Sequence, residues 1–177
     1  MNRFPGVFLD RDGILNRAVV RDGKPYPPSR LDELEILLGT AFSLTRLSEL
    51  GFLLIGVTNQ PDVARGTQSR EVVETMNAVI LSRLPIQEIF VCYHDESDNC
   101  ICRKPKPGLI LQASEKYDVD LSRSWMVGDR WKDIGAGQAA GLRTIFVDYH
   151  YSEAYKGKLA DFTTTDTQYL ADIISKV

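Results

Sequence analysis

The chain has 177 residues, of which 44% are hydrophobic and 25% charged, and its net charge at pH 7 is -3. This is the composition of a soluble globular protein, and the length suits one domain over residues 1–177. The acidic balance argues against nucleic acid as the main partner, and no run is apolar enough for a membrane span. The three cysteines cannot all pair, which favours a reducing compartment, so we expect a cytoplasmic protein. We also expect a monomer.

Short apolar runs alternate with helical patterns along the chain. Strands are predicted over 7–10, 52–58, 86–93, 124–129, 143–149 and 160–165. Helices are predicted over 40–50, 69–84, 107–117 and 131–141, with a last helix that begins at Asp166. The irregular segment 17–38 contains a hairpin that turns at Asp22-Gly23. This order predicts an α/β fold, a Rossmann-like, doubly wound parallel sheet that carries helices on both faces and no large cap domain.

Two aspartates follow the first predicted strand, in the stretch FLDRDGILN. Ligands of parallel sheets bind beyond the carboxyl ends of the strands, which is where Asp10 and Asp12 lie. The functional interpretation makes Asp10 a nucleophile and Asp12 an acid–base group, with both carboxylates at a Mg²⁺ site. The alternative is an aspartate-rich turn, since D-x-D-G is common in loops.

A second acidic stretch, VGDRWKDI, follows the fourth predicted strand. Asp129 ends that strand and Asp133 lies one helical turn further on. Mg²⁺ prefers a few carboxylates together with water and substrate oxygens, and the first and fourth strands could be neighbours in the sheet. The alternative is that Asp129 caps the helix that follows. The presence of Asp10 and Asp12 favours the metal site.

The most specific pattern is VCYHDESDNCICRKPKPG, which contains every cysteine of the chain. Cys92, His94, Cys100 and Cys102 supply three thiolates and an imidazole, a complete tetrahedral Zn²⁺ set that leaves no position for water, so the zinc would be structural. The alternative is three buried free cysteines beside a surface histidine, against which the clustering argues. His150 has no such neighbours and is expected in a surface loop. Residues 92–102 are called the Cys/His loop below.

Together with VTNQ after the second strand, these stretches resemble the haloacid-dehalogenase-type (HAD) phosphatases from Asp10 to Asp133. The Cys/His loop resembles that of the branch containing the heptose bisphosphate and histidinol-phosphate phosphatases. The resemblance implies a Mg²⁺-dependent phosphoric monoester hydrolase that forms an aspartyl-phosphate. It implies catalytic roles for Asp10, Asp12, Thr58 and Lys104, Mg²⁺ ligands at Asp10, Asp12 and Asp129, zinc at Cys92, His94, Cys100 and Cys102, and substrate contacts from Asn16, Asn59, Gln60, Arg65, Arg103 and Arg130.

The expected substrate is a small sugar phosphate, and the motifs favour one branch. TNQPDVARG and CRKPKPG resemble the heptose enzymes, which implies hydrolysis of D-glycero-D-manno-heptose 1,7-bisphosphate at C7. The five-residue gap between His94 and Cys100, and Arg130, resemble the histidinol-phosphate branch instead. Ile14 replaces the usual Thr and Pro61-Asp62 replaces Ser-Gly, and Ile14 keeps open a catalytically idle sugar-phosphate-binding protein. The acidic balance disfavours a polynucleotide 3′-phosphatase.

Without a large cap, the pocket should be open and bounded by residues 17–30, residues 61–66 and the Cys/His loop. Arg103 and Lys104 begin one residue after the last cysteine. A loop of this length does not hold two cations rigidly by itself, and structural zinc contributes on the order of 10 kcal/mol of ordering. We therefore expect the metal to fix the loop so that Arg103 and Lys104 reach the phosphate.

Overall fold

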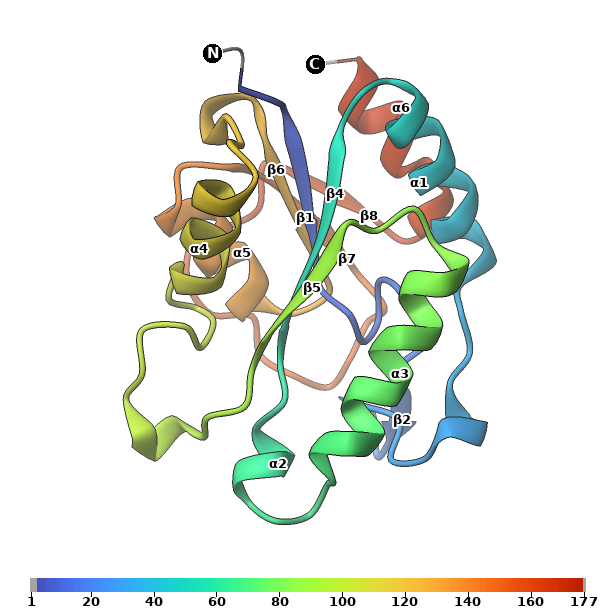
Figure 1. Ribbon diagram of the computed structural model, residues 1–177, viewed down its shortest axis with the longest axis vertical. Helices are drawn as coiled ribbons and strands as arrows, with labels where there is room; N and C mark the ends of the chain where they lie inside the picture. The colour runs from blue at the N-terminus through green and yellow to red at the C-terminus, as the bar shows by residue number, and fades with distance from the viewer. Residues whose placement is uncertain (1–2, 177) are drawn as a thin grey trace.

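The computed structural model describes residues 3–176 and centres on a six-stranded sheet (Figure 1). Its strands, in the spatial order β5-β4-β1-β6-β7-β8, are β5 (Glu88–Cys92), β4 (Leu53–Asn59), β1 (Gly6–Leu9), β6 (Trp125–Gly128), β7 (Arg143–Val147) and β8 (Phe162–Thr164). All pairings are parallel, and the predicted neighbourhood of the first and fourth strands is confirmed by Phe8 opposite Met126. The chain adds strands first on one side of β1 and then on the other. The order in which strands are added therefore reverses beside β1, while all the strands stay parallel.

Helices cover both faces of the sheet, as the alternating pattern predicts (Figure 1). One face carries α1 (Leu38–Glu49), α3 (Arg70–Arg83) and α6 (Leu170–Ser175), and the other carries α4 (Gly108–Lys116) and α5 (Trp131–Ala139). The strand side chains alternate between two buried clusters. Val7 and Leu9 pack with Leu44 of α1, whereas Phe8 packs with Ile110 of α4. Each strand is therefore apolar on both sides.

Two segments show detail that the sequence pattern did not give. The predicted last helix begins with a 3-10 turn, Thr167–Tyr169, which Asp166 caps by accepting from the Gln168 amide at 2.9 Å, and α6 follows it. The turn after VTNQ is a short helix, α2 (Pro61–Ala64), because proline suits the first helical turn. Within the described range 3–176, no helix is both long and apolar enough to cross a membrane.

The segment before α1 contains the predicted hairpin, formed by β2 (Val19–Arg21) and β3 (Lys24–Tyr26). Asp22 and Gly23 both have positive φ angles, 50° and 72°, as the tight turn of a two-residue hairpin requires. The Gly23 carbonyl accepts a hydrogen bond from the Ser152 amide at 2.8 Å. The hairpin is thereby joined to the loop that follows β7.

Candidate active site

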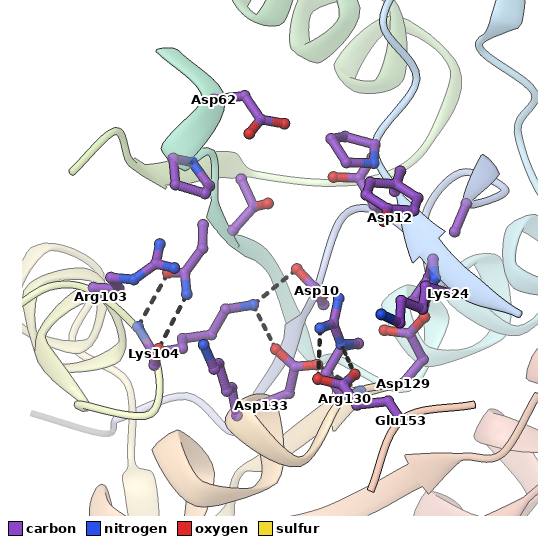
Figure 2. A pocket seen from close by; sticks show the side chains of 18 of the residues that line it. Asp10, Asp12, Lys24, Asp62, Arg103, Lys104, Asp129, Arg130, Asp133 and Glu153 are labelled. Atoms are coloured by element: carbon purple, nitrogen blue, oxygen red, sulfur yellow. Dashed lines mark hydrogen bonds and ion pairs between the residues drawn. The ribbon is translucent and has the colours of Figure 1, made fainter. Parts of the chain in front are cut away.

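The carboxyl ends of β1, β4 and β6 lie side by side and open into a cavity of about 600 Å³ (Figure 2). Its lining includes Asp10, Asp12, Thr58, Asn59, Asp62, Arg103, Lys104, Asp129, Arg130 and Asp133. The three predicted walls are confirmed, because Tyr26, Arg65 and Glu96 line the cavity from the hairpin, the 61–66 segment and the Cys/His loop. A fourth wall, which sequence reasoning missed, comes from residues 152–156.

Buried acids meet one buried cation on the floor of this cavity. Asp10, Asp129 and Asp133 each offer an oxygen within 4.8 Å of the other two. The Lys104 ammonium lies 2.8 Å from Asp10 Oδ1 and 2.6 Å from Asp133 Oδ1, and it donates to the Val57 carbonyl at 2.7 Å. This group of four side chains is called the carboxylate centre below. When ionised, its three carboxylates face one ammonium. The centre then has a net negative charge that one divalent cation would balance.

The electrostatics of the carboxylate centre favour a bound cation. Burial, followed by repulsion from Asp133, raises the pKa of Asp10 to about 7. Burial and the charges of Asp10 and Asp133 likewise raise the pKa of Asp129. Burial lowers the pKa of Lys104, but the carboxylates of Asp10 and Asp133 outweigh it and the net pKa is raised. Neither oxygen of Asp129, which is 3% exposed, has a hydrogen-bond partner among the described residues. Unpartnered buried carboxylate oxygens fit the coordination that Mg²⁺ requires.

Two glycines allow the carboxylates to come this close. A Cβ atom at Gly13, whose φ is +94°, would lie 1.9 Å from Asp129 Oδ2. A Cβ atom at Gly128 would lie 2.1 Å from the Cβ of Asp133. The G of D-x-D-G and the G of VGD are therefore both required by the backbone of the site. The capping role considered for Asp129 is wrong, because the helix N-terminus is bonded by Asp133, which accepts from the Arg130 amide at 3.0 Å.

Asp12 lines the cavity but lies outside the carboxylate centre. Its carboxylate accepts from Gln60 Nε2 at 2.8 Å, from Asn16 Nδ2 at 3.0 Å and from Arg11. Asn16 is fully buried and Gln60 is 1% exposed, and both amides hold Asp12 in this structure, whereas the substrate contacts predicted for them stay predictions. The carboxylate of Asp12 is not among the oxygens that gather within 4.8 Å of one another, whereas that of Asp133 is, and the predicted role of Asp12 as a Mg²⁺ ligand stays a prediction.

Asn59 fixes the position of Lys104. Its Oδ1 accepts from the Lys104 amide at 3.0 Å and its Nδ2 donates to the Lys104 carbonyl at 3.1 Å. This pair of bonds ties the end of β4 to the residue that follows Arg103. The Thr58 hydroxyl is 1% exposed, lines the cavity and accepts from Gln60 Nε2 at 3.0 Å, so its own proton remains free to be donated.

The predicted arginines all line the cavity, but they differ in their partners. Arg65 is bonded to Asp95 at 2.6 Å and is also paired with Asp62. Arg130 donates to Glu153 Oε1 at 2.7 Å. Arg103 donates only to the His94 carbonyl, at 3.2 Å, among the bonds formed within residues 3–176. Arg103 is thus the best placed of the three to accept an anionic ligand.

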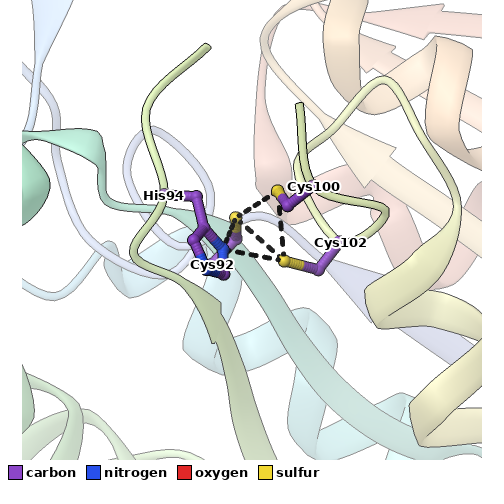
Figure 3. A group of neighbouring side chains, drawn as sticks. All are labelled: Cys92, His94, Cys100 and Cys102. Atoms are coloured by element: carbon purple, nitrogen blue, oxygen red, sulfur yellow. Dashed lines mark hydrogen bonds between the residues drawn. The ribbon is translucent and has the colours of Figure 1, made fainter. Parts of the chain in front are cut away.

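Cys92, His94, Cys100 and Cys102 of the Cys/His loop converge on one point (Figure 3). Their sulfur atoms lie 3.2, 3.4 and 3.7 Å apart, and His94 Nδ1 lies 3.3 Å from Cys102 Sγ. Zn–S bonds of about 2.3 Å in a tetrahedron place sulfur atoms about 3.8 Å apart. All three cysteines are free thiols, so the geometry is that of a ligand set and not of a disulfide. His150 is exposed in a loop, as predicted.

Comparison with known proteins adds an independent line of evidence. The HAD-hydrolase-like family model matches residues 101–172. The chain is 34% identical to the D-glycero-alpha-D-manno-heptose-1,7-bisphosphate 7-phosphatase of Photorhabdus laumondii, with 82% of this chain and 83% of the relative covered. It is 36% identical to the D-glycero-beta-D-manno-heptose-1,7-bisphosphate 7-phosphatase of Pseudomonas aeruginosa, with 80% and 79% covered. The chain belongs to the HAD-like phosphatases.

A solved structure of this HAD-like phosphatase family has the same fold. The D,D-heptose 1,7-bisphosphate phosphatase from B. bronchiseptica, complexed with magnesium and phosphate, superposes with a TM-score of 0.81. That structure is 27% identical and covers 97% of this chain and 98% of its own. A putative HAD-like phosphatase from Mesorhizobium loti superposes with a TM-score of 0.77 at 26% identity, covering 98% and 85% of the two chains. The chain is thus a phosphoric monoester hydrolase with a Rossmann-like fold and no large cap.

Ile14 gives no reason to expect that this HAD-like phosphatase is inactive. Its side chain is fully buried in the cluster of Val7 and Leu44, and its carbonyl accepts from the Thr40 hydroxyl at 2.6 Å. Isoleucine at this position therefore packs in the core and takes no hydroxyl away from the cavity side of Asp10. The only feature that favoured an inactive protein has a packing explanation.

Proposed function

We propose that the chain hydrolyses the 7-phosphate of D-glycero-D-manno-heptose 1,7-bisphosphate in a Mg²⁺-dependent reaction. The observation that carries this proposal is the carboxylate centre on the cavity floor, with Asp12 beside it. Its support is the similarity to relatives named as heptose 1,7-bisphosphate 7-phosphatases over about four fifths of the chain. The names of these relatives differ in the anomer, alpha or beta, so both anomers are candidates.

The residues of the site divide the reaction into two steps. In the first, an Asp10 oxygen attacks phosphorus, the bond to the C7 oxygen breaks, and Asp12 gives its proton to that oxygen. In the second, water attacks phosphorus, Asp12 takes the proton of the water, and the bond to Asp10 breaks to release phosphate. Lys104 lies 2.8 Å from the attacking carboxylate and offsets its repulsion of the phosphate.

Magnesium is the cation that this site suits best. Asp10, Asp129 and Asp133 would hold it, and its charge would stabilise the oxygens of the transferring phosphoryl group. Lys104 keeps its own proton and stays an ammonium, because both neighbouring carboxylates raise its pKa. Arg103 and the Thr58 hydroxyl are placed to bind the phosphoryl oxygens.

The Cys/His loop suits a structural zinc ion in this proposal. With four protein ligands, zinc would have no open position and would take no part in the chemistry. It would hold the strand end at Cys92 against Cys102, and Arg103 and Lys104 follow Cys102 directly. Lys104 is 2% exposed and forms bonds to four residues of the site, so its position depends on the path of this loop.

The experiment is a phosphate-release screen with Mg²⁺ over both heptose 1,7-bisphosphate anomers, heptose 7-phosphate, histidinol phosphate and simple sugar phosphates. We expect the highest kcat/KM for a heptose 1,7-bisphosphate, with loss of the C7 phosphate and retention of the C1 phosphate. Preference for histidinol phosphate would assign the chain to the other branch. No release from any ester by zinc-loaded protein would identify a binding protein instead.

A further inference from the structure

A fully buried arginine lies between the two motif aspartates. Arg11 has no exposed surface and is the largest of the fully buried side chains. Its Nε and Nη2 atoms donate to both oxygens of Asp12 at 3.1–3.2 Å. Its remaining nitrogen, Nη1, donates to Asn77 Oδ1 of α3 at 3.1 Å.

Burial of an arginine is costly unless its charge is paired and its donors are satisfied. Here the paired group is Asp12, whose side chain remains 15% exposed and lines the cavity. Because Nε and Nη2 each lie 3.1–3.2 Å from both oxygens, the edge of the rigid guanidinium crosses the carboxylate, and the four contacts together fix its position. Asn77, only 7% exposed, holds the Nη1 end of the Arg11 guanidinium against α3.

We propose that Arg11 is a positioning residue that aims Asp12 at the leaving-group oxygen, with Asn77 as its anchor. This inference rests on the proposed function, in which Asp12 gives a proton to the C7 oxygen and later takes one from water. Arg11 cannot supply that proton itself, because a guanidinium stays protonated in proteins. Its contribution acts through Asp12 alone and matters most when the leaving group needs a proton.

Leaving-group dependence separates this role from a merely structural one. The variant Arg11→Lys keeps the charge and replaces the contacts from Nε and Nη2 by those of a single ammonium. We expect kcat/KM for heptose 1,7-bisphosphate to fall by about 10- to 100-fold, part of what general acid catalysis contributes. The leaving group of p-nitrophenyl phosphate departs as a stable anion, so proton donation contributes little to its release. For this ester we expect kcat/KM to fall by no more than about threefold.

Three further variants complete the test. Arg83→Lys makes the same change in an exposed arginine of α3, the helix that carries Asn77, and should leave both rates unchanged. Asn77→Ala should give the same pattern as Arg11→Lys with a smaller loss, and it reports on the anchor if Arg11→Lys fails to fold. In an Asp12→Asn background, Arg11→Lys should cause no further loss, because the two residues act as one unit.

Equal losses on the two esters, or an additional loss in the Asp12→Asn background, would overturn the positioning role while leaving the proposed function intact. Full activity of both Arg11→Lys and Asn77→Ala on the heptose ester would overturn it as well. A wild-type protein that hydrolyses neither ester would overturn the proposed function, and this inference with it.

Discussion

The carboxylate centre and the Cys/His loop both gather side chains that could hold a metal ion, but they are built in opposite ways. Asp10, Lys104, Asp129 and Asp133 come from segments far apart in the chain, and all four are buried. The Cys/His loop takes its four ligands from eleven consecutive residues, and only Cys92 among them is buried. The first set exists only when the sheet is folded, whereas the second is largely fixed by local spacing.

The difference extends to what each set leaves open. The carboxylate centre faces a cavity of about 600 Å³, and both oxygens of Asp129 lack partners within the described part of the chain. The Cys/His loop brings four possible ligand atoms together, the number that a closed tetrahedral zinc site takes. An open carboxylate set suits catalysis and a closed thiolate set suits structure. Lys104, two residues after Cys102, connects the two regions.

The largest expected effect is that of Asp10→Asn. Loss of the nucleophile should lower kcat by at least about 10³-fold. The fold should be retained, and stability should not fall, because one of three crowded carboxylates is neutralised. Phosphate release and thermal unfolding measure the two effects, and Asp32→Asn at an exposed site serves as the control. Substantial residual turnover would show that Asp10 of the carboxylate centre is not the nucleophile.

The Cys/His loop should respond differently. Cys100→Ser should abolish zinc retention and lower kcat/KM by about 10- to 100-fold through misplacement of Lys104, while the sheet stays folded. Zinc content, circular dichroism and phosphate release are the measurements. Ile101→Ser, which changes a side chain that is 80% exposed between two of the cysteines, is the matched control and should be neutral. Full activity of zinc-free protein would show that the position of Lys104 does not depend on zinc in the Cys/His loop.

A third variant tests the connection between the regions. Asn59→Ala removes both hydrogen bonds to the Lys104 backbone and should lower kcat/KM by about 10-fold without loss of zinc. Gln112→Ala, the loss of an exposed amide on α4, should change nothing. If Asn59→Ala releases zinc instead, the amide supports the loop and not the lysine.

The smallest expected effect concerns magnesium and pH. The pKa of Asp10 is raised in the folded protein from 3.8 to about 7, so the folded state holds an extra proton between these values. The associated stability is present at low pH and is lost as pH rises through about 7. Mg²⁺ should offset this loss, raising the melting temperature by a few degrees at pH 8 and by much less at pH 5. Equal shifts at both pH values in zinc-loaded protein would argue against the carboxylate centre as the magnesium site.

Much of this contrast could be predicted from the sequence. The alternation of strands and helices, the hairpin at Asp22-Gly23 and the clustering of four side chains in the Cys/His loop follow from periodicity, turn residues and spacing. These signals are local or depend only on the alternation of elements.

The contacts made across the fold could not be predicted in this way. Asn16 and Gln60 are polar residues near the motifs, and only the folded loop shows that they hold Asp12. Arg11 appears in the sequence as one more charge between two aspartates, and its bond to Asn77, 66 residues away, is seen only in the fold. Glu153 joins the cavity from a loop without a motif, and no sequence signal pointed to it.

The most direct test of the central claim is to locate the phosphoryl group during turnover. Protein mixed with heptose 1,7-bisphosphate and Mg²⁺ is quenched in acid within milliseconds, digested, and its peptides are identified by mass spectrometry. The account predicts a phosphorylated peptide with the modification on Asp10, absent from Asp10→Asn protein. A phosphoryl group on any other residue, or none while phosphate is released at the full rate under conditions that trap acyl phosphates, would contradict it.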